Sequence, residues 1–89
     1  MTNNLKDFEQ VFIAISELTR GYHAKLKHIG SDIRELRKKN QPIDDLREQR
    51  TVITKLHSRC MLIKSRIKLE NYPSYSSETM ELLAKYRQL

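Results

Sequence analysis

The sequence predicts an all-α protein, an antiparallel helical hairpin followed by a short C-terminal helix. Two long stretches carry apolar residues at alternating spacings of three and four, and a proline-containing turn separates them. This heptad pattern is typical of helices that pack lengthwise against one another. The 89 residues include only 2 Gly and 2 Pro and no Trp, a composition that favours long helices over sheets. A chain of this length is expected to form a single domain, residues 1–89.

The first helix is expected over residues 4–39. Its heptad positions are apolar or aromatic except for Thr19, and they are Phe8, Phe12, Ile15, Thr19, Tyr22, Leu26, Ile29, Ile33 and Leu36. Gly21 and Gly30 lie inside this stretch, and each costs up to about 1 kcal/mol relative to alanine. A break at either glycine is left open. Because the heptad spacing passes both glycines without a shift, we expect one continuous helix.

The second helix is expected over residues 42–69, after a turn at residues 40–42. Pro42 suits the first position of a helix, and Asp44 and Asp45 suit its first turn. The heptad positions of this stretch are Leu46, Gln49, Ile53, Leu56, Cys60, Ile63 and Ile67. A turn this short makes the two helices antiparallel neighbours.

Residues 70–76 are expected to form a linker, since Asn71, Pro73 and Ser74 are all turn-forming residues. A short third helix is then expected over residues 77–88. Its apolar side chains leave one side suited to burial. The sequence leaves open whether that side packs on its own chain or on a neighbouring one.

Apolar residues outside the heptad positions gather at the end of the hairpin opposite the turn. A two-helix hairpin buries one stripe per helix and is marginal in water. We therefore expect a dimer that forms a four-helix bundle, or a complex with another helical protein. The residues expected at this protein interface are Phe8, Phe12, Ile15, Leu18, Met61, Leu62, Leu69, Leu83 and Tyr86.

The leading functional hypothesis is a non-catalytic protein–protein interaction module that acts as an adaptor, a chaperone-like partner or a regulator. The sequence contains no Gly-rich phosphate loop and no nucleophile motif. His23 and His28 are five residues apart, which is not the spacing of two metal ligands on one helix face. Cys60 falls on a heptad position, where a thiol behaves as a small hydrophobe. We expect no catalytic residue, no cofactor, no metal and no small-molecule substrate.

A nucleic-acid-binding bundle is the alternative hypothesis. The net charge is +6, and residues 49–69 carry six basic residues and no acid. Several basic residues recur every seven positions, so they form stripes that can follow a phosphate backbone. A solvated flank of the bundle would show the same pattern. The residues of these stripes are Arg20, Lys27, Arg34, Lys38, Arg50, Lys64 and Lys68.

A second alternative comes from the turn, which reads Pro-Ile-Asp-Asp-Leu-Arg-Glu after a long first helix. In this segment the chain resembles the small all-helical chorismate mutases, which have three helices and hold a dicarboxylate with cationic side chains. Where that family has two further arginines, this chain has Leu26 and Glu9. The resemblance implies a related fold without the catalytic set, and the residues that it matches are Arg37, Arg47 and Glu48.

We expect a cytoplasmic protein with no membrane partner. The N-terminal residues show no basic region followed by an apolar run, so they do not resemble a signal peptide. The longest apolar run, residues 11–15, is far shorter than a membrane span. A single cysteine fits a reducing compartment.

Overall fold

The structure is a computed structural model that describes residues 3–89. This part of the chain forms three α-helices and no strand: α1 (Asn3–Lys38), α2 (Asp44–Arg66) and α3 (Pro73–Gln88). The predicted all-α class is confirmed for these residues, and residues 1–2 of the predicted domain lie outside them. None of the three helices is both long enough and apolar enough to cross a membrane.

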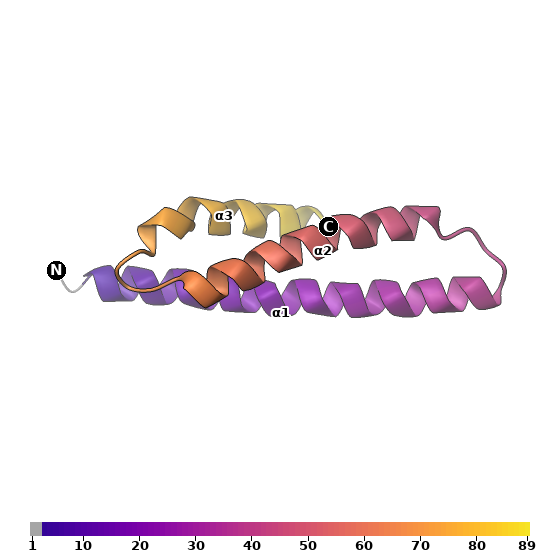
Figure 1. The fold of residues 1–89 in the computed structure, drawn as a ribbon, viewed down its shortest axis with the longest axis horizontal. Coiled ribbons are helices and arrows are strands. Elements are labelled where there is room, and N and C mark those ends of the chain that lie inside the picture. The colour runs from indigo at the N-terminus through magenta and orange to yellow at the C-terminus, as the bar shows by residue number, and fades with distance from the viewer. Residues whose placement is uncertain (1–2) are drawn as a thin grey trace.

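The molecule is a rod that measures 59 × 19 × 15 Å, and α1 forms its long axis. α2 runs back along α1 from the turn, and α3 lies beside both helices over the half of the rod away from the turn (Figure 1). The first turns of α1 project past the end of α2 (Figure 1). We call this end of the rod the open end.

The core follows the heptad positions. Apart from Leu18 and Leu82, every buried apolar residue occupies one of them, and the set is Ile15, Leu18, Tyr22, Ile29, Ile33, Ile53, Cys60, Ile63, Ile67 and Leu82. Gln49, a polar heptad residue, stays exposed. α1 continues through Gly21 and Gly30, so the side chains on either side of both glycines keep one register against α2.

α1 ends in a hydrogen-bonded turn in which Asn40 takes a left-handed φ of 54°. The N–H of Gln41 donates to the carbonyl of Leu36 at 2.9 Å, and the N–H of Asn40 donates to that of Arg37 at 3.1 Å. This pair of bonds is the Schellman arrangement, and asparagine tolerates its left-handed residue better than most side chains do. α2 then begins at Asp44, two residues after the predicted start.

The connection between α2 and α3 is residues 67–72, earlier than the predicted linker of residues 70–76. α2 ends at Arg66, and the backbone is extended at Ile67. The side chain of Asn71 donates to the Arg66 carbonyl at 3.0 Å and accepts from the Lys68 N–H at 2.7 Å. α3 begins at Pro73, four residues before the predicted start, because proline suits the first helical turn, where its missing N–H costs nothing.

α3 is held to the hairpin by polar and aromatic contacts. The Tyr22 hydroxyl donates to the Leu82 carbonyl at 2.6 Å, and its ring meets the ring of Tyr86 edge-on at 5.1 Å. Burial raises the pKa of Tyr22 to about 12, with smaller contributions from Cys60 and Tyr86. The phenol therefore stays protonated and keeps donating this hydrogen bond at any neutral or mildly alkaline pH.

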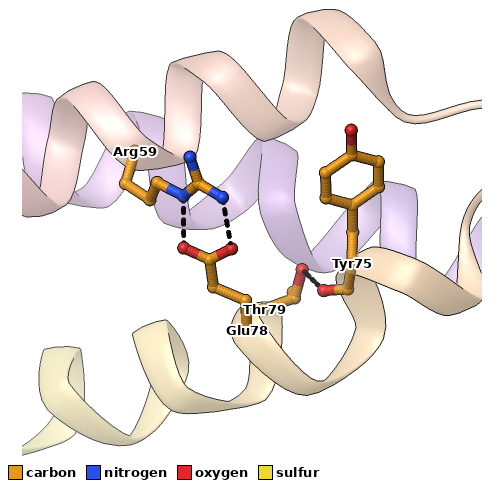
Figure 2. A network of polar contacts seen from close by, with 4 residues as sticks. All are labelled: Arg59, Tyr75, Glu78 and Thr79. Carbon is orange, nitrogen blue, oxygen red and sulfur yellow. Dashed lines mark hydrogen bonds and ion pairs between the residues drawn. The ribbon is translucent and has the colours of Figure 1, made fainter.

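An ion pair between Arg59 and Glu78 joins α2 to α3 (Figure 2). The guanidinium donates two hydrogen bonds to the carboxylate, and this bonding lowers the pKa of Glu78. Thr79, which is 2% exposed, donates to the Tyr75 carbonyl at 2.8 Å within α3 (Figure 2). That bond satisfies the hydroxyl, so Thr79 packs as a small core residue.

Candidate functional site

The predicted protein-interface residues divide into covered and exposed groups. Ile15 and Leu18 are 0% and 4% exposed, so they belong to the core of the single chain and offer no surface to a partner. α3 covers this part of the hairpin, which the sequence left open. Three further residues of the predicted interface, Phe8, Leu83 and Tyr86, are partly buried against the core. Leu62 is partly buried as well.

Exposed apolar residues remain at the open end. Of the residues predicted at the interface, Phe12 is 38% exposed and Leu69 is 49% exposed, and Met61, on α2, is 48% exposed. Leu5 and Ile13, which were not in the predicted set, are 53% and 55% exposed on the projecting turns of α1. Leu5 lies seven residues before Phe12 and so continues the heptad spacing, a signal that could have found it. We call Leu5, Phe12, Ile13 and Leu69 the open-end patch.

Aromatic contacts hold the open-end patch in place. The ring of Phe8 lies 5.9 Å from that of Phe12 and 6.1 Å from that of Tyr72, centroid to centroid. Phe8 is partly buried and packs against the core. The exposed ring of Phe12 therefore packs against Phe8, which in turn packs against Tyr72 in the connection that follows α2. This packing gives the patch a fixed shape before any partner arrives.

The basic stripes predicted from the sequence are exposed. Each of the residues Arg20, Lys27, Arg34, Lys38, Arg50, Lys64 and Lys68 lies on the surface. Their side chains take no part in the ion pair found within residues 3–89, which joins Arg59 to Glu78.

His23 of α1 and His57 of α2 lie side by side, with ring centroids 5.7 Å apart and ring planes 34° from parallel. Burial, and then the nearby charge of His23, lower the pKa of His57. Sequence reasoning missed this pair, because it compared histidine spacings within one helix only. Across residues 3–89, no three His, Cys, Asp or Glu side chains gather as metal ligands would.

Cys60 is 0% exposed at the interface of the helices. Burial, followed by the charge of Glu78, raises the pKa of its thiol to about 11. The thiol is therefore protonated at neutral pH and shielded from reagents, which suits a packing residue and not a nucleophile.

A groove of about 470 Å³ opens where α3 ends, between α1 and α2. Its lining mixes polar and apolar side chains: Lys25, His28, Ile29, Gln49, Ile53, Gln88 and Leu89. Lys25 also places its ammonium 4.9 Å from the centre of the Tyr86 ring. No Asp or Glu side chain lines this groove.

The three residues that the chorismate mutase resemblance matched, Arg37, Arg47 and Glu48, are exposed near the turn. Comparison of the chain with protein-family models, with curated proteins and with solved structures gives no match. The resemblance therefore rests on the turn segment alone. The two surfaces that could bind a partner are the open-end patch and the basic stripes.

Proposed function

We propose that this chain is a non-catalytic helical interaction module that pairs with a second copy of itself through the open-end patch. The observation that carries this proposal is the exposure of Leu5, Phe12 and Ile13 together on the projecting turns of α1. Clustered apolar side chains on a small domain mark an interaction site more often than scattered ones do. Such a module acts as an adaptor, a chaperone-like partner or a regulator.

Charge favours a second copy as the occupant of the patch. Residues 3–17 carry Lys6 against Asp7, Glu9 and Glu17, whereas the positive charge of the chain lies in its middle. Two copies that meet at their open ends therefore keep their basic stripes apart. Such a pairing is isologous, the commonest interface of homodimers.

The proposed pair differs from the four-helix bundle expected from the sequence, because the two copies meet only at their open ends. Apart from Phe12 and Gln49, the heptad positions of α1 and α2 are covered or partly covered within one chain. The patch is therefore the group of exposed apolar side chains that we propose a partner buries. We propose a cytoplasmic location for this module, since the free buried thiol of Cys60 fits a reducing compartment. Another helical protein with an apolar face is the competing occupant.

The test is the solution mass of the wild type and of two matched variants, measured by light scattering over a range of concentrations. Ile13→Glu places a charge in the patch and is expected to weaken the dimer at least tenfold, as loss of a central apolar contact does. Val52→Glu is the control, because Val52 is 49% exposed against 55% for Ile13 and lies on α2 away from the open end.

A wild type that stays at 10.6 kDa at every concentration would contradict the pairing. Equal dissociation of both variants would also contradict it, because the effect would then come from added charge and not from the patch. Ile15→Asp is not a useful probe of docking. Ile15 is 0% exposed, and a buried unpaired carboxylate is expected to unfold the chain.

A further inference from the structure

Two lines of basic residues run along one face of the hairpin. On α1, Arg20, Lys27 and Arg34 recur every seven residues, and on α2, Arg50 and Lys64 are fourteen residues apart with His57 midway between them. Seven residues are two helical turns, so each line is straight and repeats about every 10 Å. We call this surface the basic face.

The histidine pair shows that the two lines are neighbours. His57 belongs to the α2 line, and His23 lies three residues after Arg20 and four before Lys27, on the same side of α1. Their ring centroids are 5.7 Å apart. The two lines therefore flank one edge of the contact between α1 and α2, at a helix spacing of roughly 8–10 Å.

The basic face lies away from α3. The α1 residues that contact α3 include Tyr22, which bonds to Leu82, and Lys25, which lies over the Tyr86 ring. Lys25 lies two positions from His23 and two from Lys27 along the chain. Two positions correspond to about 200° around the helix, so Lys25 lies on the opposite side of α1. α3 thus covers one flank of the hairpin and leaves the basic face open to solvent.

Almost no acid interrupts the basic face. α2 has no acidic residue after Glu48. On α1, Glu17 is the one acidic residue that lies three or four residues from Arg20, Lys27 or Arg34. It lies three residues before Arg20. Every Lys and Arg of the two lines is exposed, and in residues 3–89 none of them forms an ion pair. Apart from Glu17 beside Arg20, no acid lies one turn from these residues on their own helix, so their charge remains available to an anionic partner.

We propose that the basic face binds the phosphate backbone of double-stranded nucleic acid, independently of the pairing at the open-end patch. Two parallel rows of cations at a regular repeat suit a partner with regularly spaced charge. Unpaired strands are normally held by stacking on aromatic side chains. The one aromatic ring among the exposed large apolar residues of the described chain is that of Phe12, at the open end. The basic face therefore presents no exposed Phe, Tyr or Trp ring, and its aromatic rings are the imidazoles of His23 and His57.

A membrane surface is the less suitable partner. Binding to the surface of a bilayer uses a continuous apolar stripe beside the basic residues. Along the central part of the basic face, the exposed large apolar residue is Met61. It lies three residues before Lys64, and a single side chain does not make a stripe.

The test is binding to a fluorescent 20-base-pair duplex of DNA and of RNA, measured by anisotropy over a series of salt concentrations. Lys27→Glu combined with Lys64→Glu is expected to weaken binding at least tenfold and to flatten its salt dependence, because phosphate contacts are lost. Lys55→Glu combined with Lys85→Glu is the matched control, since both residues are exposed and lie off the two lines.

The matched design separates a site from net charge. Each Lys→Glu change removes two positive charges, so both double variants fall from +6 to +2. Equal losses in the two variants would overturn the basic face as a site. Tight binding to vesicles with about a third of anionic lipid, without binding to either duplex, would also overturn the proposal and favour a membrane. Arg34→Gln combined with Arg50→Gln gives a second, milder reading should the first variant fold poorly, and it too must weaken duplex binding.

Discussion

His57 is the residue at which folding and charge are most directly linked. Its ring is partly buried beside His23, and its pKa is lowered by burial and then by that neighbour. Within four residues of either histidine along the chain, the charged residues are all basic: Arg20, Lys25, Lys27, Lys55 and Arg59. The folded chain therefore holds this ring neutral at a pH where the unfolded chain already protonates it.

We expect the free energy of unfolding to fall as the pH drops through 6.5, the ordinary pKa of histidine. Below that value the unfolded state binds more protons than the folded one, so protonation favours unfolding. The loss is complete once the pH passes the lowered pKa of the folded state. Urea midpoints at pH 7.5 and 5.5 measure it. His57→Gln should reduce the difference, and His28→Gln, an exposed position on α1 outside the pair, should retain the wild-type difference. An unchanged difference in His57→Gln would contradict the assignment.

The two glycines of α1 form a matched pair at the level of the helix. A Cβ added at Gly30 meets nothing within 4 Å, whereas one added at Gly21 lies 2.8 Å from the Tyr86 hydroxyl oxygen and 2.9 Å from two ring carbons. Both positions are helical, so both gain the same helix propensity from alanine. They differ only in what the new methyl group touches, namely open space or α3.

Gly30→Ala is expected to raise the free energy of unfolding by up to about 1 kcal/mol, because alanine favours the helix. Gly21→Ala is expected to be less stable than Gly30→Ala by at least about 1 kcal/mol, because the Tyr86 ring must leave its edge-on contact with Tyr22. Chemical denaturation compares the two variants, and near-ultraviolet circular dichroism reports the tyrosines. Equal stabilisation would show that α3 shifts at no cost.

The sequence predicted the helices better than their boundaries. The heptad spacing identifies the buried side of α1 and α2, because such helices are stabilised mainly by burying one apolar stripe. It cannot distinguish a proline that ends a helix from one that begins it. Pro73 follows Asn71, a turn former, yet Asn71 caps α2 and Pro73 starts α3. Those roles depend on hydrogen bonds that exist only in the folded chain.

The surfaces were predictable in part. The basic stripes follow from residue spacing, and each of their members is exposed. The contact between His23 and His57 was not predictable, because a heptad repeat defines which side of each helix is buried but not how far one helix slides along the other. Ile15 and Leu18 were expected at an interface between chains, but both are buried within the single chain. Whether a third helix folds back depends on contacts such as that of Tyr22 with Leu82.

At the scale of the whole molecule, the narrow shape of the rod holds many positive charges close together. The chain carries a net charge of +6, and the two lines of the basic face run side by side along a rod only 19 × 15 Å in cross-section. Like charges at this spacing repel, and the repulsion is screened once the Debye length, about 10 Å at 0.1 M salt, falls below their separation. In the absence of a partner, this repulsion therefore destabilises the folded chain.

We expect the thermal midpoint of the free chain to rise by a few degrees when sodium chloride is raised from 50 to 500 mM, because screening relieves this repulsion. Arg34→Gln combined with Arg50→Gln should reduce the rise, since it removes one cation from each line. Lys55→Gln combined with Lys85→Gln removes the same charge elsewhere and should keep the rise. A bound duplex relieves the repulsion too, so it should raise the midpoint at 50 mM salt and have little effect at 500 mM. A midpoint that falls with salt in the wild type would mean that the ion pair between Arg59 and Glu78 outweighs the basic face, and the face would then not be the dominant charge of the fold.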